Sequence, residues 1–396
     1  MYPNARRPSG VSLIELMVAL AIAALLSLGL LQIFSASSDT ARMQEGLSRV
    51  QENGRFAMQF LHRNLNMVGF EGCGSDVGRM QQASFVNHLA QYDAAVPGGN
   101  TVDSEYRFQR PLEAFRAGSS AVPDELAGVE DDLVEGSDVL VMRVPSEESV
   151  PVISITRDAM TLRVALDSTP DFMPDEGMKT LFVMQNCRSA DVFAGELAGG
   201  QLIIDGGGSP NEYLDPTVTS CGGDAGCPWD FRISNATLNA RPLSGGVPRL
   251  NAEVHRAEYM ALYVLDRGET PGLYMSRFSR NSMTLDDSAE LVQGVENMQL
   301  RFGYDTSDPV DAMVDEYRTA DEITAGLADP AALDEAWRRV LSVRVALLVR
   351  SADRAGVTGE ARTYDLFGEE ISPAADGRMR QVYVTTIALR NRLFNS

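Results

Sequence analysis

The stretch that decides the fold lies near the start of the chain and is, over residues 10–34, GVSLIELMVALAIAALLSLGLLQIF. After Gly10 its only charged side chain is that of Glu15. A helix over residues 11–34 would be about 36 Å long, enough to cross a hydrocarbon core of about 30 Å. Because a carboxylate inside a membrane-spanning segment is costly, Glu15 is predicted to need a partner and to mark a functional site.

Two ordinary interpretations explain this stretch incompletely. A cleaved secretory signal would use Arg6 and Arg7 as its basic region and residues 35–37 as its cleavage site. The apolar region of such a signal is only about 7–15 residues long, and it does not contain a glutamate. A plain membrane anchor explains the length, but it explains neither Glu15 nor the position of Gly10 just before the apolar run.

A basic leader, then Gly10, Val11 and, four residues later, Glu15 resembles the signal of type IV prepilins, although Phe is more usual than valine at the position of Val11. The resemblance implies that a prepilin peptidase cleaves between Gly10 and Val11 and that the new amine is N-methylated. It also implies that Glu15 pairs with the N-terminal amine of a neighbouring subunit, because opposite charges in a low-dielectric helix bundle strongly prefer contact.

Composition limits the class of partner. The chain has 396 residues, 44% of them hydrophobic, and a formal charge of −21. The leader, residues 1–10, carries two arginines and no acid, so the chain without it is at about −23 (−21 minus 2). So negative a chain is not expected to bind nucleic acid. The two leader arginines predict a cytoplasmic N-terminus, with the rest of the chain outside the inner membrane.

Residues 35–72 are predicted to continue the helix as an amphipathic rod. Its apolar stripe has a gap at Gly54 and consists of Met43, Leu47, Val50, Ala57, Leu61, Leu65 and Val68. Gly29 and Gly54 are predicted bending points, and Gly69 predicts the end of the helix.

Four cysteines follow the membrane segment, namely Cys73, Cys187, Cys221 and Cys227. An even number in an extracytoplasmic domain predicts disulfides. Of the three connectivities, Cys221–Cys227 with Cys73–Cys187 is favoured. Zinc is disfavoured, because the cysteines lack metal-ligand spacing and lie far in sequence from His62, His88 and His255.

No motif predicts catalysis, a cofactor or a metal. The acidic cluster at residues 130–135 lacks the order of a calcium loop and is predicted to be solvated. The glycines at 206–208 have no following Lys-Ser or Lys-Thr, which disfavours a phosphate-binding loop. Nucleophile-elbow and histidine-rich zinc motifs are also missing from the sequence.

The rest of the chain predicts an α+β fold in which the long helix packs on antiparallel sheet. Predicted strands cover residues 137–144, 150–155, 161–165, 181–184, 201–204, 258–265, 272–278, 291–305, 340–350 and 380–392. The segment 291–305 is predicted to be half-buried, because polar and apolar side chains alternate along it. A short helix is predicted from Pro330 to Arg339, and loops dominate residues 205–250.

Three further segments resemble, in family order, the PilW-like minor pilins and the related J-type pseudopilins. They are the helix end at residues 64–73, the strand at 294–305 and the terminal strand at 383–392. The resemblance implies a leader (1–10), a transmembrane or filament-core helix (11–34), its amphipathic continuation (35–72) and an extracytoplasmic β-rich domain (73–396). Within that domain, about 75–255 would be a variable insertion and 256–396 a family-like sheet.

The same resemblance implies a non-catalytic minor pilin that helps to start type IV pilus assembly and lies in or near the pilus tip. The implied partners are the prepilin peptidase, the inner-membrane assembly platform, other minor pilins, the major pilin and a large tip adhesin. The chain would cross the inner membrane once before it enters the pilus on the cell surface. Three alternatives stay open: a J-type pseudopilin of type II secretion, which is usually much shorter, a tip adhesin in its own right, and a membrane-anchored enzyme with a paired-carboxylate site, which no motif singles out among the 55 acidic residues.

Overall fold

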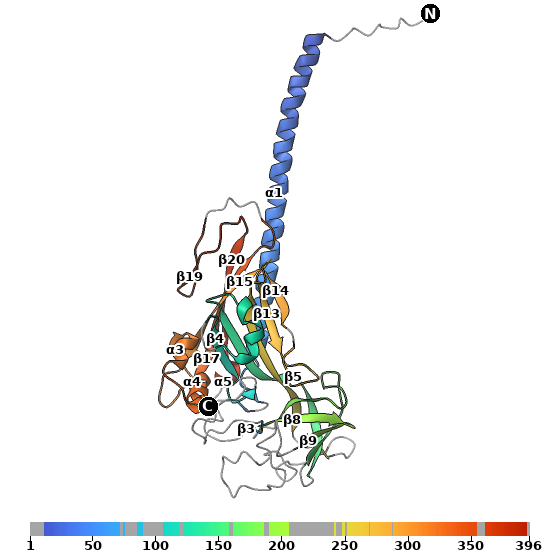
Figure 1. Cartoon of the computed structure of the whole chain (residues 1–396), viewed down its shortest axis with the longest axis vertical. Helices are drawn as coiled ribbons and strands as arrows, with labels where there is room; N and C mark the ends of the chain where they lie inside the picture. The colour runs from blue at the N-terminus through green and yellow to red at the C-terminus, as the bar shows by residue number, and fades with distance from the viewer. Residues whose placement is uncertain are drawn as a thin grey trace, which may run out of the picture.

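The molecule consists of one long helix and a β-rich head, as the computed structural model in Figure 1 shows. The structure describes residues 12–71, 74–75, 85–89, 106–118, 122–157, 161–185, 190–205, 241–242, 248–249, 252–268, 270–286, 288–354 and 361–393. All four cysteines, together with Gly10 and Val11, lie outside these ranges.

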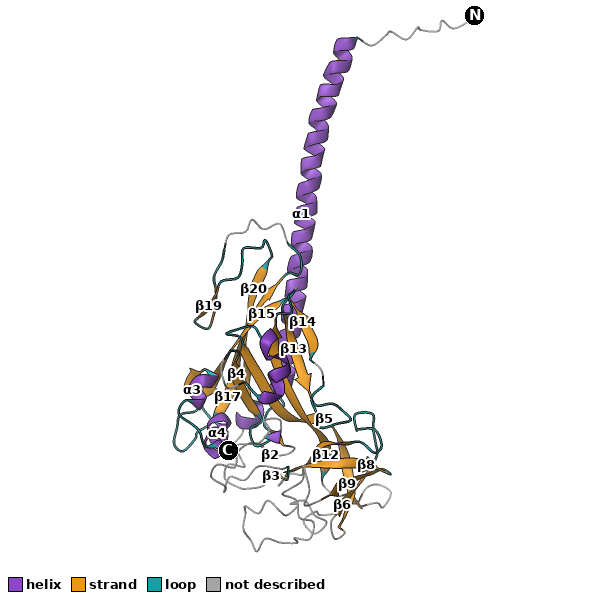
Figure 2. Ribbon diagram, in the orientation of Figure 1, coloured by secondary structure: helices purple, strands orange, loops and turns teal. Residues whose placement is uncertain are grey.

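Helix α1, Leu13–Leu65, is a single helix of 53 residues, which confirms the predicted continuous rod. A turn follows it, and Gly69 adopts a φ of +73°, a conformation that suits glycine at the end of a helix. The first half of α1 projects from the head, and the second half packs into it (Figure 2).

Gly54 turns out to be part of the apolar stripe of α1 rather than a gap in it. Together with Val50, Ala57, Leu61 and Leu65 it forms the buried face of the helix. A Cβ atom at Gly54 would lie 2.3 Å from a ring carbon of Tyr383. The glycine therefore lets an aromatic ring approach the helix backbone, and the helix runs through this position without a break. The stripe begins later than predicted, because Met43 and Leu47 are exposed.

The strands form two main sheets. The ten-stranded sheet has the order β14-β13-β12-β7-β8-β9-β6-β5-β4, with β3 paired to β8, and the four-stranded sheet has the order β16-β15-β17-β20. The bounds of these strands are β3 Phe85–Asn87, β4 Leu112–Arg116, β5 Asp138–Arg157, β6 Thr161–Leu166, β7 Lys179–Gln185, β8 Ala190–Ala198, β9 Gln201–Asp205, β12 Glu253–Leu265, β13 Gly272–Arg277, β14 Ala289–Gln293, β15 Val295–Tyr304, β16 Glu316–Arg318, β17 Val340–Arg350 and β20 Arg380–Ala388.

Short elements complete the described structure. They are β1 Phe70–Glu71, β2 Gly74–Ser75, β10 Arg241–Pro242, β11 Pro248–Arg249, β18 Tyr364–Leu366, β19 Glu369–Ile371, the 3₁₀ helix η2 Asp124–Asp132, and the helices α3 Ala320–Thr324, α4 Pro330–Arg338 and α5 Arg390–Leu393. Helix α4 confirms the short helix predicted after Pro330. Its N-cap is Asp329, whose carboxylate accepts the N–H of Ala332 at 3.0 Å.

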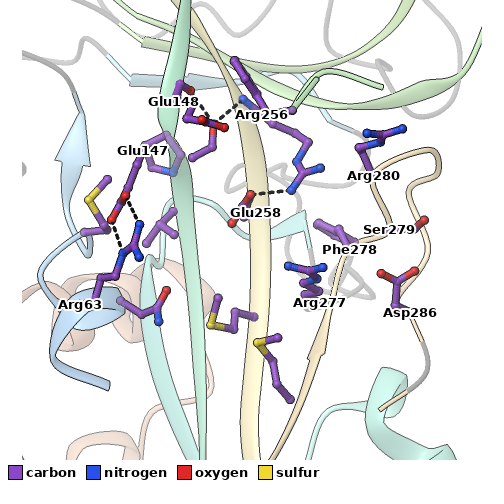
Figure 3. A pocket seen from close by; sticks show the side chains of 18 of the residues that line it. Arg63, Glu147, Glu148, Arg256, Glu258, Arg277, Phe278, Ser279, Arg280 and Asp286 are labelled. Atoms are coloured by element: carbon purple, nitrogen blue, oxygen red, sulfur yellow. Dashed lines mark hydrogen bonds and ion pairs between the residues drawn. The ribbon is translucent and has the colours of Figure 1, made fainter. Parts of the chain in front are cut away.

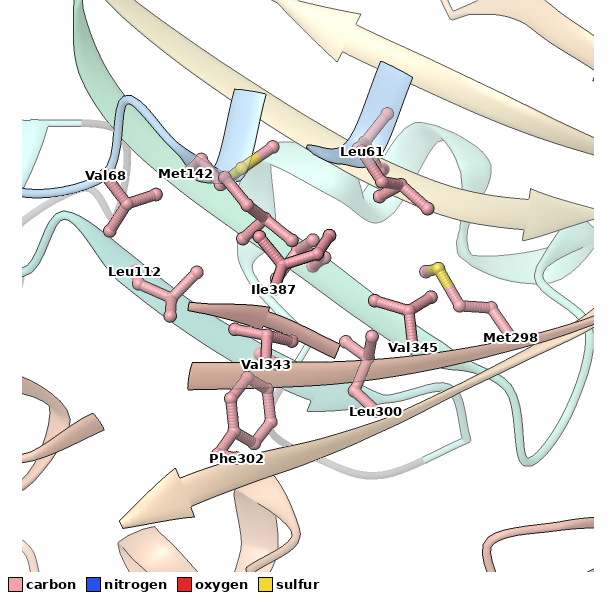
Figure 4. Close-up of a cluster of buried hydrophobic side chains, with 14 of the residues drawn as sticks. Leu61, Val68, Leu112, Met142, Met298, Leu300, Phe302, Val343, Val345 and Ile387 are labelled. Carbon is pink, nitrogen blue, oxygen red and sulfur yellow. The ribbon is translucent and has the colours of Figure 1, made fainter. Parts of the chain in front are cut away.

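The main core lies where α1 and the inner faces of the two sheets meet (Figure 4). Leu61 contributes from α1, Met142 from β5, and Val343, Phe302 and Ile387 from the four-stranded sheet. Each of these side chains is at least 99% buried. Burying a large apolar side chain stabilises a fold by about 1.5–3 kcal/mol, so this cluster binds the second half of α1 firmly into the head.

The chain passes from one sheet to the other at Gly294, between β14 and β15. Its φ is +85°, and a Cβ there would lie 2.5 Å from the carbonyl oxygen of Arg350. The N–H of Arg350 donates to the oxygen of Gly294 at 2.7 Å. The single strand predicted for residues 291–305 is therefore two strands joined by a glycine that no other residue could replace without strain.

Six strands of the large sheet close into a small barrel: β5, β12, β7, β8, β9 and β6 pair in a complete ring. The closure is visible at β5, where the N–H of Val152 bonds to Ala252 on one edge and the oxygen of Pro151 bonds to Asp167 on the other. Apolar side chains fill the interior, among them Phe182 and Phe193. The barrel lies at the end of the head opposite the free end of α1 (Figure 1).

Several sequence predictions need correction. Strand β5 is one strand of 20 residues where two were predicted, and β4 and β8 were not predicted. Along β15 the predicted exposed face is buried, because Gln299 donates to the oxygen of Gly136 at 2.7 Å and to Asn297 at 2.9 Å. The terminal strand ends at Ala388, and α5 follows it. Most of the predicted loop region at 205–250 lies outside the described residues.

Candidate functional site

The first half of α1 is an apolar rod that contacts nothing else in the described chain. Its most apolar 18-residue window has a mean hydropathy of 2.5, and none of that window is buried. Leu13 is 76% exposed and Phe34 is 75% exposed. By length and composition α1 can cross a membrane, and the same surface can pack against other helices in a bundle.

Glu15 lies in the first turn of this helix and helps to cap its N-terminus. Its Oε2 accepts the backbone N–H of Ser12 at 3.2 Å, in the arrangement of a capping box. A carboxylate here also faces the positive end of the helix dipole. The signal for this cap is present in the sequence as the Ser-x-x-Glu pattern of Ser12 and Glu15. Ser12 would be the second residue after cleavage at Gly10, so the carboxylate lies one residue from the predicted new amine.

Polar contacts fix the second half of α1 to the head at several levels. Arg63 makes a two-pronged ion pair with Glu147 of β5, with Nε 2.9 Å from Oε1. The Asn53 side chain donates to the oxygen of Gln293 at 2.9 Å, and the Tyr383 hydroxyl donates to the oxygen of Val50 at 3.1 Å. The head therefore has a fixed orientation on the helix, and a displacement of α1 moves the head with it.

A groove of about 710 Å³ opens between the end of α1, the barrel and the large sheet (Figure 3). Met260 and Met275 are buried beneath it, and Arg256 forms an ion pair with Glu258 at 2.6 Å on its wall. Its charged lining residues are Arg63, Arg256, Arg277, Arg280, Glu147, Glu148, Glu258 and Asp286. Both signs are equally represented, and its lining contains neither histidine nor cysteine.

A buried ionic cluster joins the large sheet to α4. Glu113 of β4 accepts from Arg110 at 2.9 Å and forms an ion pair with Arg143 of β5. Arg110 also bonds to Asp334 of α4 at 2.8 Å, and all four side chains are at least 96% buried. Burial by itself would raise the pKa of Glu113, but the guanidinium groups of Arg143 and Arg110 outweigh it and lower the pKa to about 2. The cluster is shielded from solvent, and its ion pairs connect β4 and β5 to α4.

Asp138, at the start of β5, is a second buried carboxyl group between the sheets. It accepts the N–H of Leu300 at 2.6 Å. Burial raises its pKa to about 7, although this hydrogen bond and nearby Arg116 and Arg301 oppose the shift.

Asp138 should make the head less stable as the pH rises. Its folded pKa of about 7 lies above its ordinary value of 3.8, so the folded state holds the extra proton between these values. Stability is then lost between about pH 4 and pH 7, by up to roughly 3–4 kcal/mol. Asp138→Asn keeps an acceptor for Leu300 and should remove this loss. The measurement is the difference between variant and wild type in unfolding free energy at pH 4.5 and pH 7.5. The exposed Asp286→Asn is the control, and an equal pH slope in Asp138→Asn and wild type would contradict the assignment.

The three histidines all have structural surroundings. His62 is exposed on α1, beside the Asn66 amide at 3.0 Å. His88 pairs with Asp191 at 2.8 Å, and both are fully buried. His255 lies between Gln185 at 2.6 Å and the oxygen of Ser146 at 2.7 Å.

No group of metal-ligating side chains occurs among the described residues. The acidic cluster at 130–135 overlaps η2, and Asp132 pairs with Arg267 at 3.2 Å, with both side chains 45% exposed. The predicted disulfide cysteines, Cys73, Cys187, Cys221 and Cys227, lie outside the described residues, so their pairing stays a prediction.

Two family models match the chain, one at each end. Residues 262–391 match the family described as "Type IV Pilus-assembly protein W". Residues 5–31 match the "Prokaryotic N-terminal methylation motif". No curated protein and no solved structure matches the chain.

The two matches fall on the elements that build the pilin-like framework. The methylation motif covers the free half of α1, and the other match runs from β12 to α5 and includes the whole four-stranded sheet. The PilW family is a structural, non-catalytic family. Residues 262–391 therefore resemble the PilW family of type IV pilus-assembly proteins, and the N-terminal region carries the prepilin-type methylation motif.

Proposed function

We propose that this chain is a minor pilin that helps to initiate type IV pilus assembly and is incorporated in or near the pilus tip. Other pilin subunits carry the same kind of apolar helix, and these helices pack together into one bundle. Its head is held rigidly on that helix by the core and by the contacts of Arg63, Asn53 and Tyr383. The chain can therefore be extracted from the membrane as one body.

The location of the barrel in the head is the observation that supports a position at the pilus tip. Strands β6, β8 and β9 lie beyond the end of α1, at the pole of the head farthest from the membrane-spanning half (Figure 2). A subunit whose N-terminus points to the cell leads with this pole as the fibre grows outward. A bulky extension at the leading pole is accommodated best where no further subunit follows, which favours the end of the fibre over its shaft.

The processing and pairing sites complete the proposal. Prepilin peptidase cleaves between Gly10 and Val11, the Val11 amine is methylated, and Glu15 pairs with the amine of an adjacent subunit. The Glu15 carboxylate supports this by facing the start of the helix, 3.2 Å from the Ser12 nitrogen. The partners are other minor pilins, the major pilin, the inner-membrane assembly platform and a large tip adhesin. The chain lies in the inner membrane first and in the pilus afterwards.

Gold labelling of sheared fibres tests this function. An epitope inserted into the chain should give label at one end of the fibres, and deletion of the chain should sharply reduce the number of fibres. Label spaced along the shaft would contradict the tip position. Fibre production that is unchanged in the deletion strain would contradict the role in initiation.

A further inference from the structure

The outer edge of β20 is a long strand edge that the described part of the chain leaves unpaired. β20 closes the four-stranded sheet and pairs with β17 along all nine of its residues, 380–388. The other edge of this sheet, β16, has only three residues. The edge strand β14 of the large sheet lies against α1, whose Asn53 bonds to Gln293.

The direction of the backbone groups of β20 follows from the hydrogen bonds that flank the ladder. The N–H of Leu389 donates to Leu341 at 2.8 Å, and the N–H of Ser351 donates to Met379 at 2.8 Å. In an antiparallel pair, hydrogen-bonded residue pairs alternate with non-bonded ones. The odd-numbered residues of β20 therefore face β17, and Val382, Val384 and Thr386 direct their N–H and C=O groups to the free edge.

The side chains of β20 lack the features that protect strand edges. Proteins usually shield a long edge with charges, prolines, bulges or covering segments. From Gln381 to Ala388 the strand has no charge and no proline, and its register with β17 has no bulge. Its single charged residue, Arg380, is already neutralised by Glu296 and Asp376. Val384 is 59% exposed.

We propose that this edge accepts an extended segment of a neighbouring pilin subunit of different sequence, which adds a fifth strand to the four-stranded sheet. The inference rests on the proposed function, because the neighbour is a subunit of the same assembly. The segment would be an uncharged strand rich in β-branched or aromatic residues, and its backbone would pair with the outward N–H and C=O groups of Val382, Val384 and Thr386.

Two observations select this occupant. β20 lies directly beside α1, since the Tyr383 ring rests on Gly54 and its hydroxyl bonds to Val50. Helix α1 is the element through which pilin subunits assemble, so the neighbours that pack around it lie next to this edge. A second copy of this chain fits less well, because two heads from chains with a formal charge of −21 repel one another.

Photo-crosslinking in cells that make pili tests the strand addition. A photoreactive amino acid replaces Thr386 in the full-length chain, and crosslinked peptides are identified by mass spectrometry. The expected product joins this chain to an extended segment of another pilin subunit. Val384→Pro removes one outward N–H from an edge strand, and Val384→Lys adds an edge charge. Each should reduce the product about tenfold. Val384→Thr keeps the N–H and the β-branch, and should change the product less than about twofold.

Thermal unfolding of each variant tests whether its head still folds. If Val384→Pro does not fold, the result for Val384→Lys decides whether the strand addition occurs. A product that is unchanged in Val384→Lys, a product with a second copy of this chain, or no protein product at all would overturn the strand addition. Detection of the chain in fibres is scored separately. If the chain is in fibres without the crosslink, only this inference fails, whereas absence from fibres defeats the proposed function.

Discussion

Glu15→Ala should leave cleavage after Gly10 intact and reduce incorporation of the chain into fibres about a hundredfold. The proposed pairing places the Glu15 carboxylate against the amine of a neighbouring subunit inside an apolar bundle. Removing one partner of a buried ion pair costs about 3–5 kcal/mol, because the other charge stays buried without compensation. The measurement is the amount of chain in sheared fibres relative to the amount in the membrane.

Glu15→Gln separates this pairing from the local role of Glu15 in the helix. Glutamine can also accept the N–H of Ser12 and complete the capping box. If capping were the whole function of Glu15, the glutamine variant would assemble normally, and that result would contradict the pairing. Glu15→Gln should instead fail as Glu15→Ala does. The exposed Glu52→Ala on the same helix is the matched control and should assemble like the wild type.

Glu113→Gln should lower the unfolding free energy of the head by about 3–5 kcal/mol, since it removes the buried carboxylate that pairs with both Arg143 and Arg110. Glu113 is 1% exposed and lies between Arg110 and Arg143. The measurement is urea unfolding of the full chain in detergent, with tryptophan fluorescence as the readout. Trp337 is a suitable probe, because it is 1% exposed in α4, next to the residues that bind this cluster.

Asp132→Asn is the control for this prediction, since it breaks an ion pair whose two side chains are 45% exposed. It should cost less than about 1 kcal/mol. Equal effects of Glu113→Gln and Asp132→Asn would contradict the structural role of the buried cluster. Because the folded pKa of Glu113 is about 2 against an ordinary value of 4.5, its contribution should be lost as the pH falls through this interval.

The elements that the sequence predicted correctly are those with strong local patterns. Helix α1 combines a long apolar run with a stripe at helical spacing, and Gly69 ends the stripe. Strand β17 is apolar at most positions because it is central and covered on both faces. Helix α4 begins with Asp329 and Pro330, which are a cap and a first-turn residue. In each case a few neighbouring residues determine the structure.

The barrel could not be predicted because its closure depends on pairings between residues far apart in sequence. β5 meets β12 more than one hundred residues later, with Val150 opposite Val254. The polar segment Ser146–Glu148 divides the pattern of β5, although the strand continues through it. β8 is rich in alanine and glycine, which are weak strand formers, and packing on both of its faces determines its conformation.

The buried polar groups were missed for a related reason. Glu113 and Arg143 lie in strands where charged side chains usually indicate an exposed face, and they are buried as parts of one cluster, in which Glu113 pairs with both Arg143 and Arg110. Asn297 and Gln299 likewise predict an exposed face of β15. That face is buried in the structure, where the Gln299 side chain donates to the oxygen of Gly136. Partners of this kind come from other strands, and a single sequence does not reveal which strands will meet.

Mass spectrometry of the N-terminus of the chain, purified from membranes and from fibres, tests the central claim most directly. The account predicts a chain that begins at Val11 and carries a methylated amine, with Glu15 as its fifth residue. A chain that begins after Ser37, or one that keeps the leader from Met1 in assembled fibres, would contradict it.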